Sequence, residues 1–568
     1  AYSDKAVGPS PIKSPISPFV PKELTQDGIL KQISDIANTA KRAQIAGYNG
    51  VEIMGSEGYL INQFIVKHTN KRTDSWGGSY ANRIRFPIEI VQQVRKKVGP
   101  NFIIMFRLSM IDLIPNGSSW EEVLLLAREI EAAGASIINT GVGWHEARIP
   151  TIATSVPRRA FSWVTKKMMG QINIPIIASN RINTAEIAET VLSEGCADMI
   201  SMARPFLADP NFVTKVYADA AQTITPCIGC NQACLDHTFS MRLTSCLVNP
   251  GACNEKEFEY KAINKNNKSI AIVGSGAAGI AAALTARERG CRVSLFEMKS
   301  EIGGQLNLAS KIPGKEEFLG LLEYYKNEIS RRGVDLYLNY NISAVKLRTF
   351  DEVVIATGVI PRKVNFKIFD KSRVVSYVDI LQGNIIAGKN VAILGAGGIG
   401  FDVATFLVND KPSSTLDLDE WLREWGVVDP EIARGGLSPD GPTLVMPNRN
   451  VSLFQRKKEK IGRRLGKTTG WIHRESLNKK NVKMVSGVNY EKITSDGLTI
   501  SYGEERKNLQ TLWFDTIIIC AGQEPERSLY DALQAENINP HIIGGANVAS
   551  ELDAKRAIDQ GTRLALTF

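Results

Sequence analysis

The stretch 269-SIAIVGSGAAGIAAALTARERGCRVSLFE-297 decides the fold of the C-terminal half of the chain. An apolar strand runs into Gly274, Gly276 and Gly279, which have the spacing GxGxxG, and an Ala-rich helix follows. A second strand ends at Glu297, about twenty residues further on. The glycines allow a tight turn and close approach of a pyrophosphate, the helix N-terminus stabilises the anion, and the carboxylate accepts hydrogen bonds from ribose hydroxyls. The stretch predicts a Rossmann-like dinucleotide-binding domain.

A second fingerprint of the same kind lies at 390-NVAILGAGGIGFDVA-404, with its glycines at Gly395, Gly397 and Gly400. Its second strand is delayed by an insertion of roughly forty residues rich in glycine, proline and acids, and we expect that strand to begin at Val451. The chain therefore contains a second dinucleotide-binding fold.

The second fold ends its second strand in Gln455, Arg456, Lys457 and Lys458, where the first ends in an acid. A carboxylate would repel a ribose 2′-phosphate, whereas a basic cluster would bind it. This turn predicts NADPH rather than NADH as the second nucleotide. The alternative is a solvated, charged turn without a ligand.

Two related segments interleave the fingerprints: 351-DEVVIATGVIPR-362 lies between them, and 514-FDTIIICAGQEP-525 lies near the C-terminus. This order resembles the two-dinucleotide-binding flavoprotein reductases, in which an NAD(P) domain is inserted into an FAD domain. The resemblance implies FAD at the first site and NADPH at the second. The acid usual in the returning FAD segment is absent, and Ala546 stands there. The expected FAD contacts are Gly274, Gly276, Ala278, Gly279, Glu297, Gln305, Ala356, Gly358 and Gly522, and the expected NADPH contacts are Gly395, Gly397, Gly400, Arg456 and Lys457.

Half of the eight cysteines fall in 227-CIGCNQACLDHTFSMRLTSC-246. Their spacing, C-x2-C-x3-C-x11-C, is not the pair of CxxC motifs favoured by structural zinc, and His237 lies at no usual zinc spacing. Three close thiolates and one that returns later can occupy the corners of a [4Fe–4S] cluster. The spacing predicts such a cluster on Cys227, Cys230, Cys234 and Cys246, with a disulfide pair or a zinc loop as alternatives.

The N-terminal third alternates helical patterns of ten to fifteen residues with short apolar strands. The strands are 50-GVEIM-54, 102-FIIMFRLS-109, 136-SIINTG-141, 174-IPIIASN-180 and 199-MISMARP-205. Such repetition predicts an α/β fold, a (β/α)8 TIM barrel, with a doubly wound sheet as the competing arrangement. Only five of eight units are present, so we expect a barrel truncated at its N-terminus by about three units.

Several motifs of this region resemble the old yellow enzyme flavin barrels: 46-AGYNGVEIMGSEGYLINQF-64, 70-NKRTDSWGGSYANRIRF-86, 106-FRLS-109 and 201-SMARPFLADP-210. With the cysteine loop and the nucleotide module, the whole chain resembles the bacterial 2,4-dienoyl-CoA reductase family. The stretches 143-GWHEARIPTIAT-154 and 466-GKTTGWIHR-474 are similar to that family in particular.

The resemblance implies NADPH-dependent reduction of 2,4-dienoyl-CoA to enoyl-CoA in β-oxidation of unsaturated fatty acids. The implied cofactors are FMN, FAD, a [4Fe–4S] cluster and NADPH, and electrons would pass from NADPH to FAD, cluster, FMN and substrate. Arg107 would stabilise the reduced FMN ring, and Gln232 would face FMN. The candidates for the FMN phosphate are Asn180, Arg181, Ala203 and Arg204.

Tyr59 matches the proton donor of that family, and His145 is its candidate partner. A phenol is a weak acid at neutral pH, so a hydrogen-bonded relay would assist it. Met54 and Glu57 stand where ordinary old yellow enzymes carry a His pair, or His and Asn, which disfavours a generic enone reductase. The expected lining of the acyl-CoA channel is Thr69, Glu146, Ala147, Arg148 and Ile149.

A chain of 568 residues is long enough for about three or four domains. We expect a barrel over 1–222, a cluster loop over 223–266, an FAD domain over 267–386 that returns over 513–568, and an NADPH domain over 387–512. The net charge of +9 is spread out without a nucleic-acid motif, and no apolar run is long enough to span a bilayer.

The other cysteines are scattered in apolar stretches, which predicts a reducing, cytoplasmic location. We expect acyl-CoA and NADPH as small-molecule partners, and no nucleic acid, membrane or obligate protein partner. Two rival functions stay open. One is an amine dehydrogenase of the trimethylamine type, and the other is an FAD/iron–sulfur electron-transfer module that lacks a complete barrel.

Overall fold

A computed structural model describes residues 3–258, 267–409 and 412–568 of the chain. It divides into two compact units. The first contains Ala1–Ile152, Val156–Met202 and Ser414–Thr443, and the second contains Ala153–Ser155, Ala203–Ser413 and Leu444–Phe568.

The sheet of the first unit is parallel and follows the order of the sequence, β3-β4-β5-β6-β7. All five strands predicted from the apolar segments are present, although the last is only two residues long. This order has no reversal, whereas a doubly wound sheet reverses at its switch point. The strands are β3 (Gly50–Gly55), β4 (Ile103–Ile111), β5 (Ile137–Val142), β6 (Ile176–Ala178) and β7 (Met199–Ile200). A short parallel pair, β1 (Val7–Gly8) and β2 (Lys22–Glu23), precedes them.

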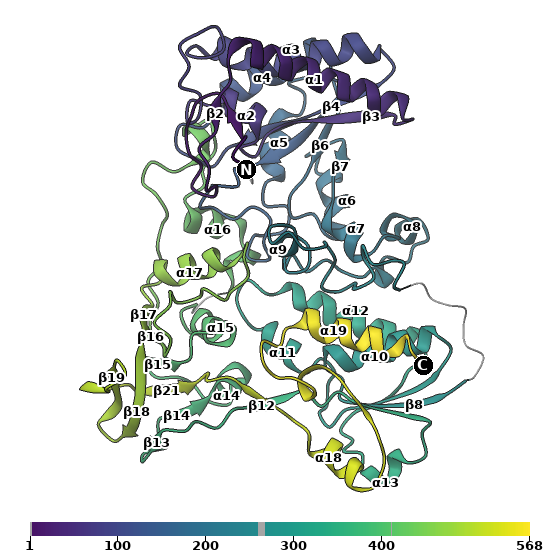
Figure 1. Ribbon diagram of the computed structural model, residues 1–568, viewed down its shortest axis with the longest axis vertical. Coiled ribbons are helices and arrows are strands. Elements are labelled where there is room, and N and C mark those ends of the chain that lie inside the picture. The colour runs from purple at the N-terminus through teal and green to yellow at the C-terminus, as the bar shows by residue number, and fades with distance from the viewer. Residues whose placement is uncertain (1–2, 259–266, 410–411) are drawn as a thin grey trace. The chain divides into compact units, whose positions relative to one another are not determined.

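Helices connect the strands, and α1, α3 and α4 lie together over β3 and β4 (Figure 1). The expected helix length of ten to fifteen residues holds for α4 but is wrong for α1 and α3, which have 20 and 19 residues, and for the shorter α5 and α6. Ser119 and Glu122 form a capping box that fixes the start of α4. The helices are α1 (Gln26–Ile45), α2 (Leu60–Ile65), α3 (Tyr80–Val98), α4 (Trp120–Ala132), α5 (Ser162–Met168) and α6 (Ala185–Ser193).

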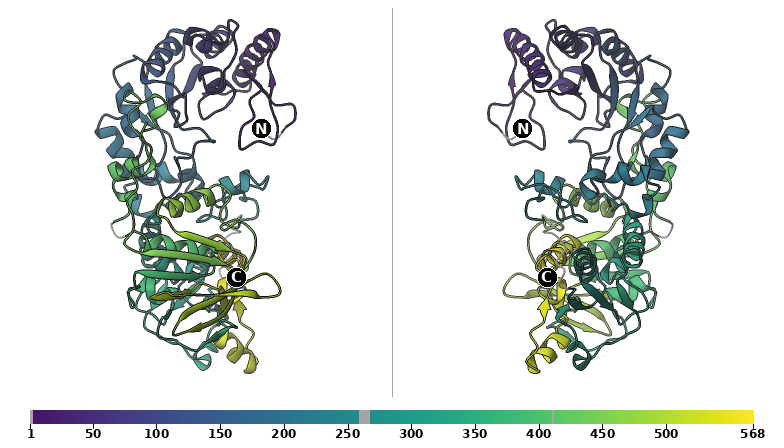
Figure 2. Two further views of the ribbon diagram at one scale, coloured as in Figure 1. Left: turned by 90° about the vertical axis from the view of Figure 1, so that its left-hand side faces the viewer. Right: turned by 90° about the vertical axis from the view of Figure 1, so that its right-hand side faces the viewer.

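The first unit also includes residues 414–443, which come from the middle of the second fingerprint fold in the sequence. Their main helix is α16 (Leu418–Trp425), drawn in green among the purple and blue elements of this unit in both views of Figure 2. The insertion predicted before the strand at Val451 is therefore confirmed, and it is part of the N-terminal unit.

The second unit contains two five-stranded parallel sheets, as the two fingerprints predict. The first has the order β10-β9-β8-β11-β23 and carries the helix α10 (Ala277–Glu288) after β8. The second has the order β14-β21-β15-β16-β17 and carries α15 (Gly398–Leu407) after β15. The strands of the first are β8 (Ser269–Val273), β9 (Arg292–Phe296), β10 (Asp335–Tyr337), β11 (Glu352–Ile355) and β23 (His541–Ile542). Those of the second are β14 (Val374–Ser376), β15 (Asn390–Leu394), β16 (Asn450–Gln455), β17 (Lys483–Ser486) and β21 (Thr516–Ile519).

A smaller sheet, β13-β18-β19-β20, and an antiparallel pair, β12 and β22, complete the strands of this unit. They are β12 (Val359–Pro361), β13 (Lys367–Ile368), β18 (Val488–Thr494), β19 (Gly497–Tyr502), β20 (Lys507–Leu512) and β22 (Gln523–Pro525). The remaining helices are α7 (Arg204–Ala208), α8 (Phe212–Tyr217), α9 (Leu235–Thr238), α11 (Gln305–Ala309), α12 (Glu317–Arg331), α13 (Ala344–Leu347), α14 (Tyr377–Gln382), α17 (Gly470–Lys479), α18 (Ser528–Ala535) and α19 (Ala554–Ala565).

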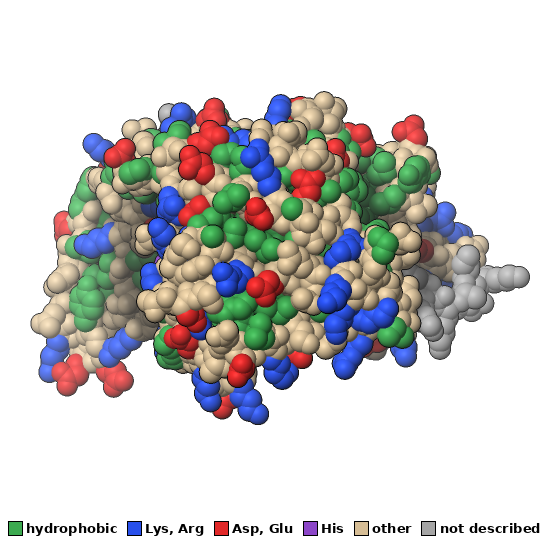
Figure 3. All heavy atoms as spheres, turned by 90° about the horizontal axis from the view of Figure 1, so that it is seen from above, with side chains coloured by type: hydrophobic (Ala, Val, Ile, Leu, Met, Phe, Trp, Pro, Cys, Tyr) green, Lys and Arg blue, Asp and Glu red, His purple; other side chains and the backbone are tan. Residues whose placement is uncertain are grey.

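The surface is mixed in character. On the face drawn in Figure 3, Lys and Arg side chains are interspersed with Asp and Glu side chains and with apolar patches. Among the helices of the described residues, none is both long enough and apolar enough to cross a bilayer.

Candidate functional site

Tyr59 and His145 meet at the carboxyl ends of strands in the first unit. Tyr59 follows β3 and begins α2, while His145 follows β5. The Tyr59 Oη and His145 Nε2 atoms are 2.9 Å apart, and the two rings meet edge to face. Tyr59 is 45% exposed, so the phenol can reach a ligand while it keeps this hydrogen bond. The structure thus brings together the two residues predicted as proton donor and partner.

Glu57 lies beside this pair. Its Oε2 is 3.9 Å from His145 Nε2, and its Oε1 is 3.8 Å from Arg107 Nη1. Burial raises the pKa of the Glu57 carboxyl, and the nearby Arg107 and His145 oppose that rise only in part. Glu57 also has a φ of 61°, in the left-handed region that non-glycine residues rarely adopt. A strained, half-buried carboxylate at a strand end is typical of a functional position.

Arg107 is held by carboxylates. Its Nε and Nη2 donate to the two Glu52 oxygens at 2.9 and 3.2 Å, and Asn139 Nδ2 donates to Glu52 Oε1 at 2.8 Å. The sequence interpretation placed Arg107 here but missed Glu52 and Asn139. A signal was present, because Glu52 is the one charged residue of β3, and Asn139 is a polar residue of the mainly apolar β5, and these strands lie on either side of β4.

The loops that carry Tyr59 and His145 interlock through Trp144. Trp144 Nε1 donates to Asp112 Oδ1 at 3.0 Å, and Ser109 Oγ donates to the same oxygen at 2.7 Å. Gly58 lies against the Trp144 ring, where a Cβ would be 2.7 Å from the nearest ring atom. The placement of Tyr59 and His145 therefore depends on packing around a buried indole.

The described part of the first unit has buried polar atoms that suit a planar polar ligand such as an isoalloxazine ring. Asn62 Nδ2 and Asn139 Oδ1 are buried and find no hydrogen-bond partner among the described residues. Such atoms are rarely left unpaired, because each loses its hydration on burial. Asn62 can donate to a ligand and Asn139 can accept from one, and a flavin ring carries polar groups of both kinds, so the chemistry of these residues fits a flavin.

The predicted phosphate and channel residues lie at strand ends or near the site. Asn180 and Arg181 follow β6 with φ values of 69° and 56°, and Arg181 is buried, with its Nε donating to the Val156 carbonyl at 2.8 Å. Ala147 and Ile149 are buried in the loop after His145, Glu146 is half-buried and Arg148 is exposed. Thr69 Oγ1 donates to the Gln63 carbonyl at 2.8 Å.

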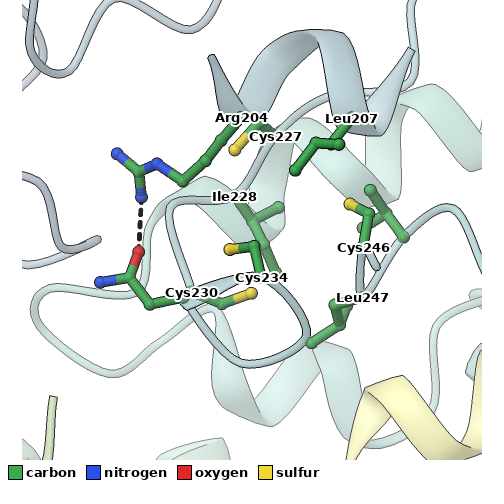
Figure 4. A pocket seen from close by; sticks show the side chains of 10 residues that line it. Arg204, Leu207, Cys227, Ile228, Cys230, Cys234, Cys246 and Leu247 are labelled. Atoms are coloured by element: carbon green, nitrogen blue, oxygen red, sulfur yellow. Dashed lines mark hydrogen bonds between the residues drawn. The ribbon is translucent and has the colours of Figure 1, made fainter. Parts of the chain in front are cut away.

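The four clustered cysteines of the second unit line one pocket. Figure 4 shows the sulfur atoms of Cys227, Cys230, Cys234 and Cys246 facing a common space beside Leu207, Ile228 and Leu247. Each of the eight cysteines of the chain is a free thiol, so the disulfide alternative is not observed.

Backbone N–H groups bond to three of these sulfurs: those of Gln232 to Cys230, Leu235 to Cys234, and Val248 and Asn249 to Cys246. Burial raises the pKa of the Cys246 thiol to about 12 and also raises those of Cys230 and Cys234. Thiolates here therefore need a cationic centre, such as iron, to stabilise them.

Within the described residues, no group of three or more His, Cys, Asp or Glu side chains has the geometry to hold one metal ion. Structural zinc needs all four ligands around one ion, whereas the thiolates of a cuboidal cluster bind at separate corners. The donor set, an apolar pocket of four thiols with backbone donors, fits an iron–sulfur cluster better than zinc.

Arg204 and Gln232 belong to the surroundings of this pocket. Arg204, which follows Ala203 and begins α7, donates from Nη1 to Asn231 Oδ1 at 2.6 Å, the dashed line in Figure 4. Its charge favours the thiolate form of Cys234. Gln232 Oε1 is buried and has no hydrogen-bond partner within the described residues, which leaves an acceptor for a ligand.

The first fingerprint has the geometry of a pyrophosphate site. Gly274 has a φ of 103°, and a Cβ there would lie 2.4 Å from the Ala356 carbonyl oxygen. Gly276 is the N-cap of α10, and a Cβ there would enter open space, where a phosphate can approach. The Glu297 carboxylate accepts from Ser275 N and Oγ at 2.9 and 2.8 Å. These contacts hold the carboxylate at the end of β9, as predicted.

The second fingerprint repeats this geometry. A Cβ on Gly395 would lie 2.2 Å from the Cys520 carbonyl oxygen, and one on Gly400 would lie 1.9 Å from the Gly395 carbonyl oxygen. Gly397 is the N-cap of α15 and faces open space. Arg456 and Lys457 are exposed after β16, where a 2′-phosphate could meet them.

The other expected FAD contacts surround the first fingerprint. Ala278 lies in the first turn of α10, Ala356 and Gly358 follow β11, and Gly522 follows β21 with a φ of 105°. Gln305 begins α11 and hydrogen-bonds to Tyr377, whose hydroxyl also accepts from Gln523 Nε2 at 2.8 Å.

Gly400→Ala should slow reduction through the second nucleotide site, because the new Cβ would overlap the Gly395 carbonyl. We expect the rate of NADPH-dependent bleaching of bound FAD to fall at least about tenfold, with FAD content unchanged. Gly320→Ala in α12 is the matched control, since its Cβ meets open space. Wild-type bleaching by Gly400→Ala would contradict the assignment.

Cys230→Ser should remove bound iron, whereas Cys253→Ser should not, because Cys253 is exposed and does not line the cysteine pocket. Iron and acid-labile sulfide content, with visible absorbance, measure the difference. Equal iron in both variants would exclude the four-cysteine pocket as the site.

Glu57→Gln should change how stability depends on pH. Because the pKa of Glu57 is raised in the folded state, that state binds more protons than the unfolded state once the pH exceeds the usual glutamate pKa of 4.5. Stability therefore falls as pH rises from there through the folded pKa. As pH rises above the usual carboxyl pKa and through the raised pKa of Glu57, the wild type should lose more stability than Glu57→Gln, measured by urea midpoints. Glu129→Gln, an exposed carboxylate on α4, is the control and should behave as the wild type. A wild-type slope in Glu57→Gln would refute the effect.

The chain matches two family models. Residues 2–222 match the NADH:flavin oxidoreductase / NADH oxidase family, and residues 268–543 match the pyridine nucleotide-disulphide oxidoreductases. These families support FMN binding in the first region and FAD and NAD(P) binding in the second.

Relatives of known activity cover nearly the whole chain. A metal reductase of Desulforamulus reducens is 36% identical over 95% of this chain and 80% of the relative. A cinnamate reductase of Clostridium sporogenes is 29% identical over 95% of this chain and 78% of the relative. An N,N-dimethylglycine/sarcosine dehydrogenase of Chromohalobacter salexigens is 27% identical over 94% of this chain and 74% of the relative.

The fold also matches a solved complex of 2-naphthoyl-CoA reductase with 2-naphthoyl-CoA. The TM-score is 0.87 and the identity 29%, over 100% of this chain and 82% of that one. The chain therefore belongs to the NADH:flavin oxidoreductase / NADH oxidase family, carries a pyridine nucleotide-disulphide oxidoreductase module in the same polypeptide, and is a flavin-dependent oxidoreductase.

Proposed function

We propose that this protein is an NADPH-dependent 2,4-dienoyl-CoA reductase, which reduces a diene conjugated to a CoA thioester in fatty-acid β-oxidation. The observation that carries the proposal is the hydrogen bond of 2.9 Å between the half-exposed Tyr59 and His145. Reduction of an activated double bond needs a hydride and a proton, and this pair supplies the proton.

The chain's own residues handle the proton. Tyr59 Oη holds it towards the ligand, and His145 Nε2 can resupply it through their hydrogen bond. The Glu57 carboxyl lies 3.9 Å from the imidazole, so Glu57 can orient His145. FMN, when bound, supplies the hydride; the cluster and FAD, when bound, connect it to NADPH.

The comparisons support a thioester substrate. The 2-naphthoyl-CoA reductase complex contains a CoA thioester, and the cinnamate reductase is named for an unsaturated acid. The sequential parallel order of β3 to β7 supports a (β/α)8 barrel for the flavin unit. The eight free thiols support a reducing, cytoplasmic location.

A second candidate is oxidation of an amine. The half-buried Glu57 carboxylate, beside Tyr59 and His145, could hold a substrate ammonium, and the N,N-dimethylglycine/sarcosine dehydrogenase is a relative. Arg107, 3.8 Å from Glu57, weakens this candidate because its charge would repel the ammonium.

Anaerobic NADPH oxidation in the presence of a 2,4-dienoyl-CoA tests the proposal. Tyr59→Phe should lower diene-dependent turnover by about 10²–10⁴-fold, the range of a lost acid catalyst, while NADPH:ferricyanide turnover stays unchanged. Tyr48→Phe, an exposed tyrosine of the same unit, is the control and should be unaffected.

Other outcomes separate the rivals. Reduction of an electron acceptor by an N-methylated amine, without need of NADPH, would favour the amine candidate. NADPH-dependent reduction of ferric iron alone, insensitive to Tyr59→Phe, would refute diene reduction and leave a reductase of the kind that the metal reductase relative is named for.

A further inference from the structure

Residues 414–443 interrupt the second fingerprint fold in sequence, yet they are built into the first unit. Trp421 is fully buried and meets the Phe161 ring edge to face, with centroids 5.9 Å apart. Lys167 pairs with Asp429 at 2.8 Å and with Glu431 at 2.9 Å. The tryptophan is buried, and the lysine pairs with two carboxylates of the insertion. This segment is therefore packed into the first unit and is not a surface loop.

The far end of the insertion bonds to the loop that follows β4. Leu113 N donates to the Gly435 carbonyl at 2.8 Å, and Gly435 N donates to the Ser118 carbonyl at 2.9 Å. Arg434 Nη1 donates to the Gly117 carbonyl at 2.9 Å and pairs with Glu122. The loop from residue 112 to 118 is thus held by backbone bonds on both sides of Gly435.

The insertion lies so close to the end of β4 and the loop after it that its residues there must be glycines. Gly435 and Gly436 both have a φ of 72°. A Cβ on Gly435 would lie 2.5 Å from the Ile114 carbonyl oxygen, and one on Gly436 would lie 2.3 Å from Ile111 Cδ1. Any side chain here would push the loop after β4 away from the insertion.

This loop carries Asp112, the buried carboxylate that positions the site. Asp112 Oδ2 accepts from Ser118 N at 2.6 Å, and its Oδ1 accepts from Trp144 Nε1 at 3.0 Å. Trp144 precedes His145 and packs against Gly58, the neighbour of Tyr59. Contacts therefore run without a gap from Gly435 to the Tyr59–His145 pair.

We propose that the segment Arg434–Gly436, contributed by the nucleotide-binding half of the sequence, positions Tyr59 and His145 for proton transfer. These are positioning residues, because they act through Asp112 and Trp144 and do not reach the reacting atoms. The inference holds whether the substrate is a diene or an amine, since it concerns the placement of the pair.

A double-mutant cycle tests it in the holoenzyme. Gly435→Ala should lower the single-turnover rate of the Tyr59-dependent reaction about tenfold and leave NADPH:ferricyanide turnover unchanged. In the Tyr59→Phe background, Gly435→Ala should cause no further loss, because the group it positions is already absent. Gly441→Ala is the matched control: Gly441 has the same φ of 72° in the same insertion, but a Cβ there meets open space.

Flavin content and melting temperature are measured for every variant. Arg434→Met takes the place of Gly435→Ala if the latter does not fold, because Arg434 is part-exposed and its loss removes the Gly117 and Glu122 contacts without adding a Cβ at Gly435. An equal fold-loss in the wild-type and Tyr59→Phe backgrounds would reveal a general structural role and overturn the proposal. A wild-type rate in Gly435→Ala would overturn it as well.

Discussion

The buried carboxylate of Asp112 is the point on which the flavin unit depends. It is 1% exposed and accepts hydrogen bonds from Ser109, Ser118 and Trp144, which come from β4, the loop after it and the loop after β5. A buried charge is tolerated only where such donors compensate for lost hydration. Because one of the donors is the indole beside His145, satisfying this carboxylate also sets the geometry of the site.

The site places charges close together. The Arg107 guanidinium lies within 4 Å of the carboxylates of both Glu52 and Glu57. The pKa of Glu57 is nevertheless raised, because burial outweighs the attraction of the arginine. A carboxyl whose pKa is raised by burial beside a Tyr–His pair is typical of a functional site. The cysteine pocket and the nucleotide folds belong to the second unit, whereas Tyr59 and His145 belong to the first.

Local patterns in the sequence predicted much of this structure. The strands before Gly274 and Gly395 and the turns after them were recognisable because close backbone approach there requires glycine. The five strands of the first unit were recognisable from short apolar runs. The length of β7 was not, because Ala203 and Arg204 already belong to the start of α7.

What sequence reasoning missed depends on contacts between distant residues. The pairing of Glu52 with Arg107 joins positions 55 residues apart, and the Arg434 contacts with Gly117 and Glu122 span more than 300. A local pattern of apolar residues cannot predict that residues 414–443, inserted in the second fingerprint fold, pack in the first unit. Glu52 stood out only as a charged residue in an apolar strand. Glu57 was recognised by its position in the flavin-barrel motif, but its contacts with Arg107 and His145 were not.

A crystal structure of the holoenzyme with an unreactive enoyl-CoA bound tests the account most directly. The account predicts the acyl chain within hydrogen-bond reach of Tyr59 Oη, with the Tyr59–His145 bond of about 2.9 Å preserved. An acyl chain bound elsewhere, or a Tyr59 turned away from both ligand and His145, would contradict it.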